Sequence, residues 1–180
     1  SDGGKVYLIL GDTTSDTPNL DGIMSDYGLK KVSGYIADTQ RCYQGNYYAI
    51  FPQLSLSGDL GSGISNQMVL LLNSPGMEKT DTDNDNLTVT PFMQTSDSGY
   101  AVTENDQTQG QYILGAVSTN AISADSSDSD SEDEDDKSDA TDTDTKTARL
   151  TVLASASMIS SDITDQLTTL DNLTLFVNSV

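Results

Sequence analysis

The chain has no histidine and no tryptophan, a single cysteine, and only eight lysine and arginine residues among 180. Without histidine it lacks the side chain that titrates nearest to neutral pH. Ser-His-Asp and Cys-His catalysis, and zinc sites built from cysteine and histidine, are therefore excluded within these residues. Because Cys42 stands alone, an internal disulfide is excluded as well, which neither requires nor forbids an exported location. These absences predict a protein that is not an enzyme.

Positive charge is scarce and does not cluster, and the net charge is −20. Such a surface repels nucleic acid phosphates and anionic lipid headgroups, so we expect no nucleic-acid partner and no direct membrane contact from these residues. Cations and basic protein surfaces are the contacts that the charge permits. No apolar run approaches the roughly 18 residues of a membrane span. Any membrane anchor is therefore expected outside this sequence.

Half of the net charge lies in one segment that contains no large apolar residue. Eleven of the twenty positions from Asp125 to Asp144 are Asp or Glu, and one is Lys137. Ordering a residue costs about 1–2 kcal/mol, which this composition cannot offset by burial. We therefore predict a disordered acidic insert over residues 123–146, within one domain formed by residues 1–122 and 147–180.

The rest of the chain reads as an α/β domain with more strand than helix. Pro18 opens a short helix that ends at Gly28, and a second strand is predicted over residues 29–38. A strand, a helix and a strand in succession favour a right-handed crossover between parallel strands. Continuous apolar runs predict central strands, buried on both faces, over residues 5–10, 68–72, 111–117 and 148–153. A final helix is expected over residues 172–180.

The predicted fold class is thus a largely parallel or mixed sheet flanked by helices. The expected core contains Val6, Leu8, Leu10, Ile23, Val69, Leu71, Ile113, Leu150, Val152 and Phe176. Residues 40–56 are rich in aromatic side chains but interrupted by Pro52, so we expect an irregular segment with at most an edge strand. The chain opens on an apparent central strand and closes within an apolar helix face, so an incomplete domain, excised from a longer protein, is expected.

Four residues are candidates for binding a ligand or partner. Asp12 follows the first strand, where open α/β sheets place ligands, although a loop or helix cap explains it more simply. Tyr43, Tyr47 and Tyr48 are suited to anchoring an interface, because tyrosine combines apolar area with a polar tip. Covering a sheet edge is the equal alternative for the three tyrosines.

The segment from Asp81 to Asn86 supplies alternating oxygen ligands through Asp81, Asp83 and Asp85, as the opening of a calcium loop does. A full EF-hand loop needs glycine at its sixth position and glutamate at its twelfth, where this chain has Asn86 and Phe92. A plain acidic turn is therefore the preferred interpretation, with calcium binding as the alternative. We predict no other cofactor.

Several segments, taken in order, resemble the extracytoplasmic auxiliary domain of gliding-motility (Gld-type) ABC transport systems. Gly3-Gly4-Lys5 before an apolar strand resembles the first segment of that family, and Asn19-Leu20 through Tyr27-Gly28-Leu29 resembles its short helix. Pro91 through Thr95-Ser96 resembles its Pro-x-x-x-Thr-Ser segment. The strand from Ala148 and the helix from Asn172 resemble its close. After the last strand the family commonly has glycine and acidic residues, whereas this chain has Ala154-Ser155-Ala156-Ser157.

This resemblance implies a fold akin to glutamine-amidotransferase-like and flavodoxin-like sheets without the catalytic residues. It implies a non-catalytic module on the extracytoplasmic face of the cell membrane, held there by an anchor outside this sequence. The implied partners are the permease and ATPase of an ABC-type transport system, with a partner protein or a polymeric substance as ligand. The alternative function is a cation-binding surface domain or a carboxylate-based hydrolase that works through Asp12.

Overall fold

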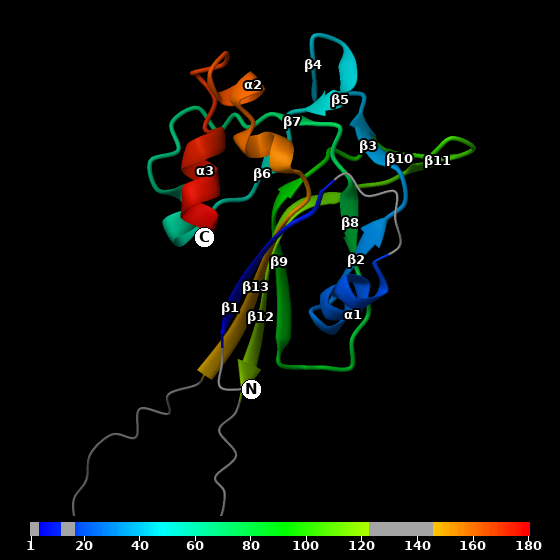
Figure 1. The fold of residues 1–180 in the computed structure, drawn as a ribbon, viewed down its shortest axis with the longest axis vertical. Helices are drawn as coiled ribbons and strands as arrows, with labels where there is room; N and C mark the ends of the chain where they lie inside the picture. The colour runs from blue at the N-terminus through cyan, green and yellow to red at the C-terminus, as the bar shows by residue number, and fades with distance from the viewer. Residues whose placement is uncertain (1–3, 12–16, 123–145) are drawn as a thin grey trace, which may run out of the picture.

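The computed structural model describes residues 4–11, 17–122 and 146–180, which form a mixed β-sheet with short helices on both faces (Figure 1). The central sheet has seven strands, in the order β1-β13-β12-β8-β2, with β9 beside β12 and β6 beside β9. Their bounds are β1 Lys5–Ile9, β2 Leu29–Val32, β6 Gln53–Leu54, β8 Gly76–Lys79, β9 Leu87–Gln94, β12 Ile113–Ile122 and β13 Lys146–Leu153.

Only one pair of strands in this sheet, β1 with β13, is parallel among the described residues. The longest contacts are antiparallel, because β12 pairs along most of its length with β13 on one side and β9 on the other. Two smaller sheets complete the described strands. One contains β3 Tyr35–Asp38, β10 Gly99–Val102 and β11 Gln107–Gln109, and the other β4 Cys42–Tyr43, β5 Asn46–Ile50 and β7 Leu71–Leu72.

The described helices are short, and the first and the last of them pack on opposite faces of the central sheet. They are α1 Pro18–Asp26, α2 Ser161–Thr164 and α3 Asn172–Ser179, with 3-10 turns η1 Gly58–Gly61 and η2 Ala156–Ile159. Tyr7 is in edge contact with Phe176 of α3, and its register places it on the same face as Val117. Ser118 points to the opposite face, where its hydroxyl donates to the carbonyl of Tyr27 at the end of α1. Among the described residues no helix is long and apolar enough to cross a membrane.

The mixed sheet and the helices over residues 18–26 and 172–179 agree with the coarse α/β prediction. The predicted parallel relation of the first two strands is wrong. β2 lies at the opposite end of the sheet from β1, and following the strand pairings shows that it runs antiparallel to β1. The place beside β1 is taken by β13, from the other end of the sequence. Pattern within a window of 38 residues contains no information about that distant pairing.

The predicted strand over residues 29–38 is two strands in different sheets. They are separated by Gly34, whose φ is +85°, a left-handed conformation that favours glycine. A side-chain carbon at this position would lie 2.1 Å from the carbonyl oxygen of Val102. Gly34 therefore allows the chain to leave β2 and pair with β10 as β3.

The predicted central strand over residues 68–72 is also wrong in its extent and its sheet. Only Leu71 and Leu72 are in a strand, and they belong to a small sheet. The backbone N–H and C=O of Leu70 bond instead to the side chain of Asn172, at 2.9 Å each. A side chain thus replaces the neighbouring strand that the apolar run would otherwise require.

The aromatic segment over residues 40–56 is more regular than predicted, because it contains β4, β5 and β6. Gln44 and Gly45 both have positive φ, at 50° and 77°, which closes a tight hairpin between β4 and β5. Pro52 lies between β5 and β6, so it interrupts neither strand.

Most of the expected core is buried, including Leu10, Val69, Leu71, Ile113, Leu150 and Val152. Leu8 and Phe176 pack against that core from partly buried positions. Val6 and Ile23 are not in the core, since 57% and 50% of their surfaces are exposed. Val6 lies on β1, which has a neighbour on one side only among the described strands. In α1 the buried residue is Met24, and Ile23 lies beside it on the outer part of the helix.

Candidate functional site

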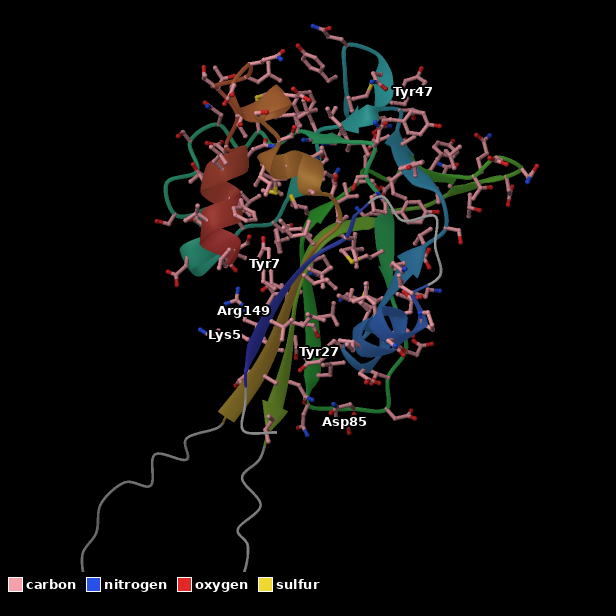
Figure 2. All side chains as sticks on the ribbon, viewed as in Figure 1. Lys5, Tyr7, Tyr27, Tyr47, Asp85 and Arg149 are labelled. Carbon is pink, nitrogen blue, oxygen red and sulfur yellow. The ribbon has the colours of Figure 1, made fainter. Side chains whose placement is uncertain are left out.

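The three candidate tyrosines lie on the β4–β5 hairpin but do not form one surface. The ring of Tyr43 packs edge-on against Phe51, with centroids 5.9 Å apart, and covers a small buried cluster that includes Ile163. Tyr47 and Tyr48 are exposed, and as consecutive strand residues they point to opposite faces (Figure 2 labels Tyr47). Tyr43 is thus partly buried over this cluster, while Tyr47 and Tyr48 are exposed, and a binding role for the three tyrosines stays a prediction.

The candidate calcium ligands Asp81, Asp83 and Asp85 lie on the exposed loop between β8 and β9. That loop is shaped by its asparagines: Asn84 Oδ1 accepts from the backbone N–H of Asn86 at 3.0 Å. No group of three or more Cys, Asp or Glu side chains in the described part of the chain is placed to hold a metal ion. Asp12 and residues 123–145 of the predicted acidic insert lie outside the described residues, while Lys146 begins β13.

Asp38, at the end of β3, is fully buried and its carboxylate accepts four hydrogen bonds. The backbone N–H groups of Gln40 and Arg41 each donate to Oδ1 at 2.9 Å. Ser96 donates from its hydroxyl to Oδ1 at 2.8 Å and from its backbone N–H to Oδ2 at 2.7 Å. Burial alone raises the pKa of Asp38, but the hydrogen bonds from Ser96, Arg41 and Gln40 outweigh it and hold the pKa below its usual value.

Asp171 and Asn172 form a second buried polar junction, at the start of α3. Asp171 Oδ2 accepts from the backbone N–H of Asn66 at 2.8 Å, and Oδ1 accepts from that of Ser65 at 3.2 Å. Asn172, besides its two bonds to Leu70, donates to the carbonyl of Met158 at 3.0 Å. These side chains fasten α3 to a loop more than one hundred residues earlier in the sequence.

The other end of α3 is fastened to β1 by polar contacts. The Tyr7 and Ser179 hydroxyls are 2.7 Å apart, and Ser179 also donates to the carbonyl of Phe176 at 2.7 Å. Burial raises the pKa of Tyr7. Because Ser179 directs its own proton to the Phe176 carbonyl, the Tyr7 hydroxyl is the donor in their contact. Arg149 lies beside this contact, within 3.5 Å of the Ser179 carbonyl, and Figure 2 shows it next to Lys5.

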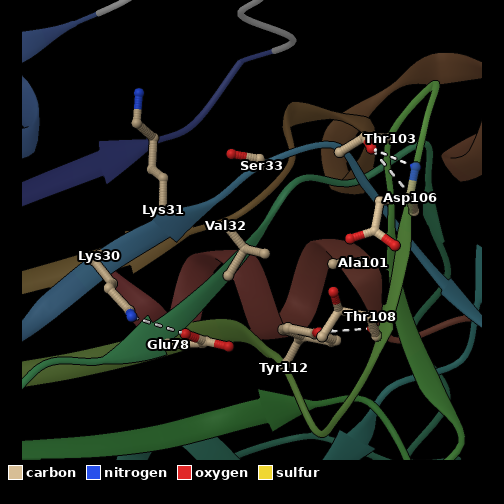
Figure 3. Close-up of a pocket in the computed structure, with 10 residues that line it drawn as sticks. All are labelled: Lys30, Lys31, Val32, Ser33, Glu78, Ala101, Thr103, Asp106, Thr108 and Tyr112. Atoms are coloured by element: carbon tan, nitrogen blue, oxygen red, sulfur yellow. Dashed lines mark hydrogen bonds and ion pairs between the residues drawn. The ribbon is translucent and has the colours of Figure 1, made fainter.

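A surface cleft of about 350 Å³ lies between the edge strand β2 and the β10–β11 hairpin (Figure 3). Val32, Ala101 and Tyr112 contribute apolar surface, and Tyr112 also donates its hydroxyl to the carbonyl of Thr108 at 2.8 Å. The rest of the lining is polar or charged: Lys30, Lys31, Ser33, Glu78, Thr103, Asp106 and Thr108. Burial, and then the nearby Glu78, raise the pKa of Tyr112.

Sequence patterns did not identify this cleft, because its walls come from three separated segments. One local signal was available. The run Thr103-Glu104-Asn105-Asp106 separates Gly99–Val102 from Gln107–Gln109, and turn residues between two short extended runs indicate a hairpin. Nothing in the sequence placed that hairpin beside β2. That neighbourhood follows from the bend at Gly34.

The comparisons with known proteins concern the fold alone. No family model matches the sequence, and no curated protein matches it. A solved structure titled mmIFT52 N-terminal domain is similar, with a TM-score of 0.56 and 12% sequence identity. The similarity covers 98% of this chain but only 63% of that one, so this chain spans less than two thirds of its length. At this identity the likeness extends to the arrangement of the sheet and helices.

Proposed function

We propose that this chain is a non-catalytic binding module that recognises a partner protein. The observation that carries the proposal is the use of the two buried carboxylates among the described residues, Asp38 and Asp171, as acceptors for backbone amides. A general acid or base working near neutral pH needs a raised pKa and access to a substrate. Asp38 is fully buried, and its pKa is shifted the other way. Both carboxylates therefore serve to hold loops in place.

The biological setting is part of the same proposal and rests on the family resemblance of the sequence. The module belongs to an ABC-type transport system, on the extracytoplasmic face of the membrane, where it binds the permease and ATPase assembly or a polymeric substance. The relation to glutamine-amidotransferase-like and flavodoxin-like sheets stays a proposal with it. A net charge of −20 favours a partner that presents a basic surface.

The test is reconstitution with defined components. The permease and ATPase of a candidate ABC-type transport system are expressed with the affinity-tagged chain, and the complex is isolated in 150 mM and in 500 mM salt. We expect capture of the permease at the lower salt and a clear loss at the higher, because electrostatic attraction between exposed charges is screened. A permease from an unrelated transport system is the control.

Absence of the cognate permease from the isolated complex would overturn the transport setting. The rival function, a carboxylate-based hydrolase or cation-binding domain, is tested with the same preparation. Hydrolysis that is abolished by Asp12→Asn, or saturable calcium-dependent NMR shifts at Asp81, Asp83 and Asp85, would favour the rival and contradict a purely binding role.

A further inference from the structure

The outer edge of β2 has backbone N–H and C=O groups that pair with no described strand. The carbonyl of Gly28 accepts from the N–H of Thr80, and in an antiparallel pair such bonds recur at every second residue. Lys30 and Val32 therefore direct their N–H and C=O groups towards β8, while Lys31 directs its own outward. The N–H of Ser33 also points outward, because it lies opposite the Val32 carbonyl across a trans peptide. No described residue makes a backbone hydrogen bond to those outward groups. In the described part of the sheet, β2 pairs with β8 alone.

The cleft runs along this same edge. Four consecutive positions, residues 30–33, line it, although neighbouring side chains in a strand point to opposite faces. A cavity that touches all four must therefore lie beside the strand rather than over one of its faces. Further along the same edge, β3 has a neighbouring strand on this side. That strand is β10, which pairs with Tyr35 through Val102 and turns away at Thr103. The cleft thus occupies the position that β10 would fill if it continued along β2.

The side chains around the cleft suit an extended chain with a positive charge. Among the described residues the ion pairs are Lys30 with Glu78, at 3.1 Å, and Lys31 with Asp21, at 2.9 Å. Each lysine of the cleft is thereby neutralised, and no described cation pairs with Asp106. One oxygen of Asp106 accepts from the N–H of Gln107 at 2.8 Å, and Figure 3 shows the carboxylate on the side of the hairpin nearer Val32.

We propose that the cleft binds an extended basic segment of a partner protein, which adds to the sheet as a strand along β2. Its backbone pairs with the outward groups of Lys31 and Ser33, and a lysine or arginine of the segment pairs with Asp106. Its apolar side chains lie against Val32 and Ala101. Strand addition of this kind draws affinity from main-chain hydrogen bonds and selectivity from the side-chain contacts. The inference rests on the proposed function and assigns a surface to it.

The experiment is an NMR titration of the complete chain with a capped seven-residue peptide of alternating threonine and valine with a central lysine. We expect the largest amide shifts at Lys31 and Ser33, and slower hydrogen exchange of those two amides. Two matched peptides separate the contributions. One carries glutamate in place of lysine, and the other is N-methylated at alternate residues, which removes donors without changing the side chains. Both are expected to bind at least threefold more weakly.

Two variants test the protein side. Asp106→Asn keeps the oxygen that accepts from Gln107 but removes the charge, and should weaken the lysine peptide roughly threefold, as for an exposed ion pair. Glu104→Gln, at the same turn but outside the cleft, is its control and should change the affinity less. Ser33→Pro removes one outward N–H and should weaken binding about fivefold, equivalent to one hydrogen bond.

Several outcomes would overturn the inference: shifts that map away from β2, equal binding of the glutamate peptide, or full binding of the N-methylated peptide. The last of these is measured on the unaltered chain and does not depend on a variant that folds. If the permease is captured but the peptide does not bind at β2, the surface assignment is wrong and the binding role stands. If the peptide binds at β2 but the permease is not captured, only the transport setting is wrong.

Discussion

Substituting Asp38 by asparagine should lower the free energy of unfolding more than the same substitution at any exposed aspartate. The variant has nearly the same size and removes one charge. Its amide nitrogen must face either the backbone N–H of Ser96, which donates to Oδ2, or the donors from Gln40 and Arg41, which share Oδ1. In each orientation a donor meets a donor inside the protein.

The magnitude follows from the bonds that are lost. A hydrogen bond to a charged group contributes about 1.5–3 kcal/mol, and a buried donor left without an acceptor costs about 1–3 kcal/mol. With one such donor stranded and the other bonds weakened to neutral ones, we expect a loss of about 3 kcal/mol in the free energy of unfolding. Domains of this size are stable by roughly 5–15 kcal/mol, so the variant should still fold. Urea unfolding followed by tyrosine fluorescence measures the difference.

The pH dependence supplies a second measurement with a definite sign. The pKa of Asp38 is lower in the folded state than in the unfolded chain. Its stabilising contribution is therefore complete above the unfolded value of about 4 and is lost as the pH falls through the folded value. As the pH falls below about 4 the parent chain should progressively lose this contribution, whereas Asp38→Asn should lack that part of the decline. Asp162→Asn, on the exposed turn α2, is the control and should stay within about 0.5 kcal/mol of the parent. A loss below 1 kcal/mol for Asp38→Asn, or parallel pH curves, would refute the reasoning.

Four further substitutions test other parts of the fold. Asn172→Ala strands the backbone groups of Leu70 and should cost about 3 kcal/mol in urea unfolding, with an unchanged stability contradicting the junction. Gly34→Ala should lower the melting temperature by several degrees in calorimetry, because φ is +85° and the added carbon meets a carbonyl; an equal melting temperature would contradict that bend. Val152→Ala should cost about 2 kcal/mol and the exposed Val6→Ala less than 1 kcal/mol, an order that the reverse result would disprove.

The predictions that depend on a few adjacent residues agree best with the structure. Pro18 and Gly28 bracket α1, and the apolar residues from Ala148 to Leu153 lie in one continuous strand. Both depend on the conformational preferences of a few adjacent residues or on a run of side chains that must be buried. The strand partners are a different matter. β1 pairs with β13 across more than one hundred and forty residues, and no local pattern specifies that choice.

Leu70 illustrates why apolar runs alone mislead. Its side chain is buried as the run predicts, yet its backbone is satisfied by the amide of Asn172 rather than by a strand. The hydrophobicity of Leu70 predicts that its side chain is buried, but the bonds to the distant Asn172 determine that its backbone is not in a strand. The cleft was missed for a related reason. Exposed acids and tyrosines stand out in a sequence, whereas the cleft beside β2 is made by an unremarkable edge and a hairpin that meet only in the folded chain.

Some acidic side chains of this protein hold the fold together, and others are available at the surface to bind a partner. The carboxylates of Asp38 and Asp171 accept hydrogen bonds from backbone amides. Glu78 and Asp21 form ion pairs with the two lysines of β2. Replacing Asp106, which no described cation pairs, should therefore alter recognition without altering stability. The same change at Asp38 should do the reverse, because its carboxylate reaches no solvent. An Asp106→Asn variant that unfolds at lower urea, or an Asp38→Asn variant whose stability is unchanged, would show that these roles are assigned wrongly.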